Sequence, residues 1–211
     1  MRSKRTWCVA VAVALLAAGC ARSGERPSWQ PAAASAPASP AAAKPKPKLE
    51  SANGMKGPLG DVIETGLKDA SGDPYVIFGV TGPMVNDSSD FGFAIGTRMP
   101  GNVIIEDLTI SEYKGSAIAP GFHPMAGQQT LSDDSQQPAF GYYVGAPAKI
   151  TVRELDRVVG AQLARWSHNP AITIFWFDPA DVRDDSDWTD LGAYDGAGNR
   201  LPEGHIERQT L

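Results

Sequence analysis

Short runs of apolar residues alternate with polar residues over most of the chain from Leu49 onward. Gly, Pro, Asn and Asp interrupt these runs at regular intervals. An apolar period of two is typical of half-buried strands, and regularly spaced short strands are typical of sandwiches and barrels. We therefore predict an all-β fold, an antiparallel β-sandwich of Ig-like or barrel-like form, with strands over 61–65, 75–78, 91–95, 102–110, 139–144, 149–152, 171–177 and 191–194.

The run that ends at Phe177 is apolar at successive positions rather than at alternate ones. In a strand, Ile172, Ile174 and Trp176 would face one side of the sheet. Phe175 and Phe177 would face the other side. Because both faces then need cover, this strand is predicted to lie inside the fold.

Residues 152–166 fit two patterns. Apolar side chains recur at the spacing of an amphipathic helix, but 150–163 also reads as a hairpin that turns at 154–157. Gly160 and several β-branched residues disfavour a helix and suit strands. We therefore predict the hairpin and keep the helix as the alternative.

The chain begins with three basic residues before an apolar run of twelve, Trp7–Ala18. This run is typical of an export signal and, at about 18 Å as a helix, is too short to span a bilayer. The following Leu16-Ala-Ala-Gly-Cys20 resembles the lipobox of bacterial lipoproteins. That resemblance implies cleavage before Cys20, a diacylglycerol on its sulfur, and anchoring on the extracytoplasmic face of the cell membrane. The alternative is an ordinary secretory signal cleaved near Ala18.

Composition divides the chain into three parts: a lipoprotein signal peptide over 1–19, a disordered Ala/Pro/Lys-rich tether over 20–48, and one domain over 49–211. Cys8 would leave with the signal and Cys20 would carry lipid, so no thiol would remain for catalysis or metal binding. The domain has 11 basic and 23 acidic residues, a net charge of −12. This charge repels phosphate backbones and excludes nucleic acid as an expected partner.

Six aspartates lie between positions 178 and 190, and Ca²⁺ prefers such carboxylate oxygens. Asp184, Asp185 and Asp187 are the candidate metal ligands. The spacing does not match a calcium-binding EF-hand loop, so we expect no metal and no cofactor. The residues therefore predict a solvated acidic loop, with a calcium site as the alternative.

Two further residues are candidates for ligand binding. His123, in Gly121-Phe-His-Pro124, is interpreted as a hydrogen-bonded residue of an ordered loop, with metal binding or catalysis as the alternative. Trp188 lies among acidic residues and outside the apolar runs. The aromatic residues as a group have two possible roles: they could form a platform on which sugars stack, or they could pack in the core. These residues are Tyr142, Tyr143, Trp166, Trp176 and Trp188.

Six segments carry a resemblance to known proteins: 60–66, 119–123, 138–145, 164–167, 175–178 and 193–199. Together they resemble a group of uncharacterised secreted and lipid-anchored proteins of high-GC Gram-positive bacteria. The resemblance implies export and a β-domain, but no activity. No Gly-x-Ser-x-Gly is present, and Ser111-Glu-Tyr-Lys114 lacks the companion motifs of penicillin-binding enzymes.

We therefore expect a non-catalytic binding or envelope-interaction module. Its expected partners are the membrane, through its lipid, and a cell-wall polymer or envelope protein. The alternative is an envelope hydrolase whose site is built from Asp178, Asp181 or His123. A two-lobed solute-binding lipoprotein is disfavoured because the sequence lacks the alternation of strands and helices found in such folds.

Overall fold

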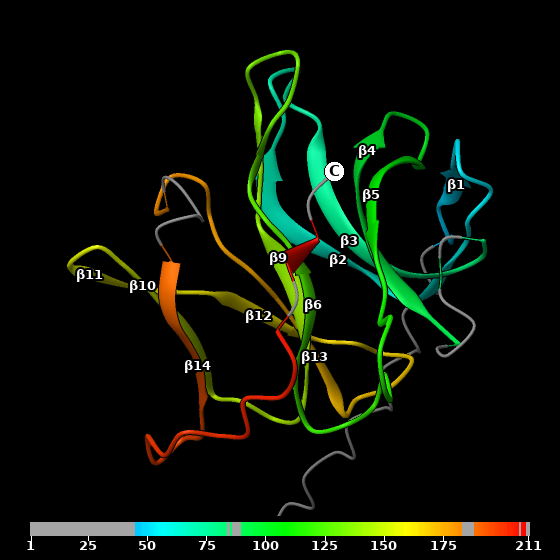
Figure 1. Ribbon diagram of the computed structural model, residues 1–211. Coiled ribbons are helices and arrows are strands. Elements are labelled where there is room, and N and C mark those ends of the chain that lie inside the picture. Colours follow the sequence, from blue (N-terminus) through cyan, green and yellow to red (C-terminus); the bar gives the residue numbers. More distant parts are fainter. Residues whose placement is uncertain (1–44, 84, 86–89, 183–187, 207, 210–211) are drawn as a thin grey trace, which may run out of the picture. The chain divides into compact units, whose positions relative to one another are not determined.

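The computed structural model describes residues 45–83, 85, 90–182, 188–206 and 208–209. Within these residues the chain forms strands and turns and no helix, which confirms the predicted all-β class (Figure 1). Cys20, the signal and most of the tether lie outside this part. In the described ranges no segment forms a helix of the length and hydrophobicity needed to cross a membrane.

The first sheet is a four-stranded antiparallel meander with one added strand. Its order is β1-β5-β4-β3-β2, and β1 pairs with β5 in parallel. Strand β1 begins at Lys48, the residue at which the tether is predicted to end. The strands are β1 (Lys48–Glu50), β2 (Lys56–Lys68), β3 (Pro74–Thr81), β4 (Gly92–Met99) and β5 (Val103–Ile110).

The second sheet has the order β12-β13-β9-β6-β15, and a three-stranded sheet has the order β11-β10-β14. A short hairpin, β7 and β8, completes the fold. The strands are β6 (Gly121–Ala126), β7 (Gln129–Thr130), β8 (Gln136–Gln137), β9 (Phe140–Val144), β10 (Lys149–Glu154), β11 (Arg157–Gly160), β12 (Gln162–Arg165), β13 (Ile172–Trp176), β14 (Trp188–Tyr194) and β15 (Arg208–Gln209).

The main core lies between the first and second sheets, as in a β-sandwich. Strands β3, β4 and β5 contribute side chains from one side, and β9 and β13 contribute them from the other. Burial of apolar surface on this scale is the dominant stabilising contribution to such folds. The cluster includes Tyr75, Ile77, Phe93, Ile95, Leu108, Ile110, Phe140, Tyr142, Ile172, Ile174 and Trp176.

Strand β13 is buried on both faces, as its sequence predicts. Ile174 and Trp176 point into the main core, whereas Phe175 packs in a second cluster against the three-stranded sheet. That second cluster also contains Ile150 and Val159. The second sheet is therefore the middle layer between two apolar cores.

The ambiguous segment after Lys149 forms the predicted hairpin. Strands β10 and β11 pair antiparallel from Glu154↔Arg157 to Thr151↔Gly160. Ala161 N–H then donates to Ile150 O at 2.9 Å, and the chain continues into β12 of the second sheet. The helical alternative is wrong, because the segment forms strands β10, β11 and β12, which pair within two different sheets.

Candidate functional site

A buried histidine and a buried glutamate are hydrogen-bonded to each other in the second sheet and the loop beside it. His123 is on β6, and Glu112 lies two residues beyond the end of β5. His123 Nδ1 is 2.8 Å from Glu112 Oε2, and their side chains are 4% and 1% exposed. His123 is thus hydrogen-bonded, as expected, but it lies on a strand rather than in a loop.

Every polar atom of this pair is engaged. His123 Nε2 is 2.8 Å from Ala119 O, and because a carbonyl only accepts, this nitrogen carries a proton and donates. A second proton lies between Nδ1 and Glu112 Oε2. Glu112 Oε1 accepts from Lys114 N–H at 2.9 Å. The pair therefore fastens the loop over 112–119 to strand β6.

The His123 ring also stacks on Tyr142 of strand β9. The ring centroids are 4.5 Å apart and the planes differ by 8°. The Tyr142 hydroxyl is buried and has no hydrogen-bond partner among the described residues. Burial, helped by the charge of Glu112, raises the pKa of Tyr142 far above its ordinary value. Tyr142 is therefore a neutral wall of the site and not a proton donor or acceptor.

A cavity of about 260 Å³ opens beside the pair. The loop over 112–120 forms one wall, and the segment at Gly204 forms the other. Gly121 and Gly204 bring the two backbones together, since a Cβ on Gly121 would lie 2.5 Å from the Cα of Gly204. The lining residues are Glu112, Lys114, Gly115, Ser116, Ala119, Pro120, Phe122, His123, Gly204 and His205.

A larger cavity of about 520 Å³ lies where residues 45–47 meet strands β2 and β4. Asn102 holds this entry segment by donating from Nδ2 to Pro45 O at 3.1 Å. Arg98 reaches Glu64 across the cavity wall in an ion pair. Cations and anions are mixed in this lining, so its charge selects no ligand.

A separate residue, Asp107 on β5, is exposed overall, and its carboxyl group makes only long hydrogen bonds. Its Oδ2 accepts from Thr97 Oγ1 at 3.3 Å and from Gln137 Nε2 at 3.4 Å. The pKa of Asp107 is raised to about 6: partial desolvation of the carboxyl contributes most, the nearby carboxylates Asp69 and Glu106 also raise it, and the Thr97 hydrogen bond opposes them. Asp107 therefore destabilises the fold when it is ionised.

The described aspartates named in the hydrolase alternative make local contacts and are not joined to His123 by a hydrogen bond. Asp178 Oδ1 accepts from Ala180 N–H at 2.9 Å, which caps a turn, and Asp181 O accepts from Arg157. Within the described ranges no three His, Cys, Asp or Glu residues gather to hold a metal ion. Asp184, Asp185 and Asp187 lie outside those ranges.

Trp188 is buried and not an exposed binding residue. It is 6% exposed, and its ring packs 4.7 Å from that of Phe177. Although Trp188 lies outside the apolar runs of the sequence, β14 pairs with β10 and turns its side chain into the second cluster. The sugar-platform alternative is wrong for the other four aromatic residues of that group, which are all buried.

Two functional candidates were missed from the sequence. Tyr113, beside Glu112 in the loop, is 47% exposed and is an aromatic side chain at the surface. Glu112 has no local signal, since its pairing with His123 depends on how the loop between them folds. Comparisons with protein-family models, with curated proteins and with solved structures found no match.

Proposed function

We propose that the protein is a lipid-anchored extracytoplasmic lipoprotein whose β-domain binds a cell-wall polymer without catalysing a reaction. The export signal and the residues before Cys20 support the anchor. The fully engaged Glu112–His123 pair carries the non-catalytic part of the proposal. Both ring nitrogens and both carboxylate oxygens already have partners, so the pair serves to hold a loop.

The loop over 112–120 is the proposed binding surface. The buried pair fixes its backbone, so little conformational entropy is lost when a ligand binds. Tyr113 offers an exposed ring for stacking on a sugar, and Lys114 and Ser116 border the cavity with polar groups. A wall glycan presents both ring faces and polar substituents, which fits this combination.

Replacing Cys20 tests the anchor. In cells fed a fatty-acid probe, the wild-type chain should be labelled and should sediment with membranes. Cys20→Ala should lose the label and the membrane association, because Cys20 is the only thiol at the end of the export signal. Labelled Cys20→Ala protein would disprove the assignment.

Co-sedimentation of the full chain with purified, insoluble wall glycan tests the binding site. Tyr113→Ser and Lys114→Ser should each lower the bound fraction several-fold. Lys149→Ser is the matched control, since that ammonium lies 5.0 Å from the Tyr194 ring on the three-stranded sheet. Equal binding by all variants, or glycan cleavage that Glu112→Gln abolishes, would overturn the proposal.

A further inference from the structure

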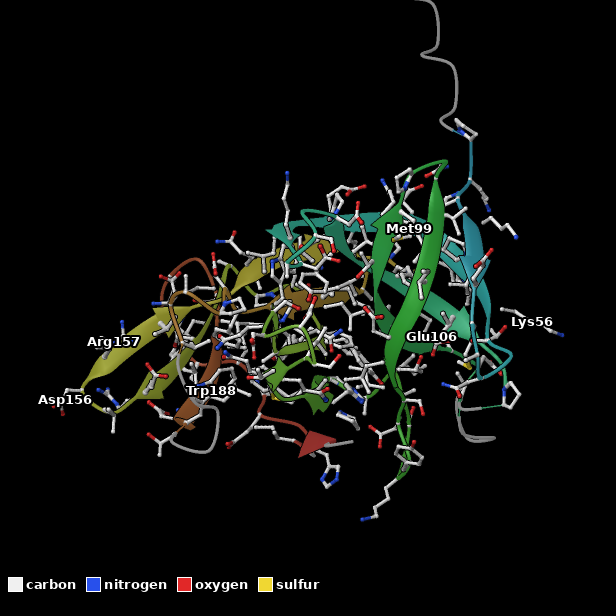
Figure 2. All side chains as sticks on the ribbon, turned by 90° about the horizontal axis from the view of Figure 1, so that it is seen from above. Lys56, Met99, Glu106, Asp156, Arg157 and Trp188 are labelled. Atoms are coloured by element: carbon white, nitrogen blue, oxygen red, sulfur yellow. The ribbon has the colours of Figure 1, made fainter. Side chains whose placement is uncertain are left out.

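The hairpin of β10 and β11 combines exposed apolar side chains with a sheet edge that no other described strand covers. Strand β11 is the outer strand of the three-stranded sheet. Figure 2 shows Asp156 and Arg157 at the end of this hairpin, which reaches away from the other strands. Leu155 is 71% exposed and Val158 is 59% exposed. Leu155 also has a φ of 50°, a left-handed conformation that is strained for leucine.

The register shows which backbone groups face outward from this edge. Residues Glu154 and Arg157 flank the two-residue turn, and Ala161 N–H donates to Ile150 O. In an antiparallel pair hydrogen-bonded residues alternate, so Arg157 and Val159 face β10. The N–H and C=O groups of Val158 and Gly160 therefore point away from the sheet.

Gly160 leaves open space on this edge. A Cβ at position 160 would meet no heavy atom within 4 Å, and its φ is not in the left-handed region. Neither packing within the chain nor backbone conformation therefore requires glycine here. Glycine inside a strand weakens it and often marks a place where another backbone approaches closely.

Two other outer strands, β1 and β12, carry charge or polarity that discourages pairing. Lys48 and Glu50 lie on β1 and form an exposed ion pair, and β12 exposes Gln162 and Arg165. Charged side chains on edge strands are a common protection against association. On β11 the outward-facing positions are instead Val158 and Gly160.

We propose that β11 pairs antiparallel with β11 of a second copy of this chain, about a two-fold axis at Val158. This register places Val158 opposite its counterpart and Arg157 opposite Val159. Asp156 then lies opposite Gly160 of the second copy. Directly opposed like charges destabilise a pair of strands, and this register contains none. A two-fold axis also makes the contact self-complementary and closed.

Charge complementarity supports this occupant. Arg153 is exposed and lies beside Val158 in the β10–β11 ladder. The Cα of Arg153 and the Cα of Asp156 in the second copy are separated by two strand spacings across the sheet and by two residues along the strand. Together these offsets give a distance of about 12 Å. The two side chains span that distance across the gap above Gly160. The pairing thus adds two identical ion pairs, one on each side of the axis.

Disulfide trapping in the full chain tests this pairing. With Cys8 and Cys20 replaced by Ser, Val158→Cys introduces the only thiol. Opposed hydrogen-bonded residues of antiparallel strands have Cα atoms about 5.5 Å apart, which suits a disulfide. We expect Val158→Cys to form covalent dimers about tenfold faster than Gln162→Cys, which places the thiol on outer strand β12. Equal rates would overturn the proposal.

A charge exchange tests the register, with sedimentation velocity of the cysteine-free chain as the readout. The dimer fraction should rise with concentration, and Arg153→Asp or Asp156→Arg should each lower it several-fold. The double variant Arg153→Asp, Asp156→Arg should restore it. Both residues are exposed, and circular dichroism checks that the variants fold. A monomer at all concentrations, or no restoration, would overturn the proposal.

Discussion

The indole ring of Trp166 lies directly against the backbone of Gly79. A Cβ at position 79 would lie 2.7 Å from Cζ2 of the indole, closer than atoms pack in proteins. Trp166 Nε1 also donates to Leu59 O at 3.0 Å, a residue 107 positions earlier in the chain. Trp166 directly follows β12 of the second sheet, and it is held by Gly79 on β3 and Leu59 on β2 of the first sheet. This contact therefore connects the two layers of the sandwich.

Gly79→Ala should destabilise the protein, because the added methyl group displaces the Trp166 ring. Overpacking of this kind costs about 1–3 kcal/mol of unfolding free energy. Gly196→Ala is the control, since no heavy atom lies within 4 Å of a Cβ there and its φ is not in the left-handed region. Urea unfolding followed by tryptophan fluorescence measures both. Equal midpoints would show that Trp166 moves aside without loss.

Trp176→Ala should lower the free energy of unfolding by about 3–5 kcal/mol, because it empties a large site in the main core. Trp176 Nε1 also donates to Thr65 O at 3.2 Å, so the indole connects β13 to β2. Trp176→Phe keeps most of the packing but loses the hydrogen bond to Thr65 O. It should therefore lower the free energy of unfolding by less, about 1 kcal/mol or somewhat more. Denaturation midpoints that do not follow this order would contradict the assigned role.

The alternation of apolar residues predicted the strands of the core but not β6. The sequence Gly121-Phe-His-Pro-Met-Ala126 has no period of two, and proline is unusual inside a strand. Its pairing with β9 shifts register between Phe122 and Met125, which accommodates Pro124. Because His123 is on this strand, its surroundings could not be inferred from the sequence.

Long-range contacts explain the remaining differences between prediction and structure. The hydrophobicity of β13 alone was enough to place it inside the fold. The burial of Trp188 depends on the pairing of β14 with β10. The acidic residues that surround Trp188 in the sequence give no indication of this pairing. Glu112 similarly owes its role to a loop that returns to His123.

Glu112→Gln should be tolerated far better than Glu112→Ala. The glutamine can accept from Lys114 N–H and donate to a neutral His123, whose Nε2–H still donates to Ala119 O, so every hydrogen bond is retained. Alanine leaves the buried His123 Nδ1 and the Lys114 N–H unpaired, and each buried polar group left without a partner costs about 1–3 kcal/mol of unfolding free energy. Thermal unfolding of the two variants measures the difference. Equal losses would mean that the negative charge, not the hydrogen bonding, holds the loop.

Asp107→Asn should stabilise the protein at neutral pH. The carboxyl has its pKa raised to about 6, mainly by partial desolvation, so the folded state binds a proton more tightly than the unfolded state does. Stability therefore falls as the pH rises from about 4 to about 6 and stays lower above that range. Asparagine removes the charge and can still accept from Thr97 and Gln137. Allowing for partial exposure of the carboxyl, the expected gain at pH 7.5 is about 1–2 kcal/mol, and it should decline as the pH falls and vanish only below about pH 3.

Asp195→Asn provides a control of opposite sign for this measurement. Hydrogen bonds from the Asn199 side chain and backbone lower the pKa of Asp195, so its ionised form is the one favoured in the folded state. Its replacement should reduce stability at neutral pH, and the loss should disappear under acid conditions where the carboxyl is protonated in both states. Urea unfolding of both variants from pH 7.5 down to about pH 2.5, below the ordinary aspartate pKa, separates the two effects. A loss of stability for Asp107→Asn at pH 7.5 would mean that its two long hydrogen bonds outweigh the cost of desolvating the charge.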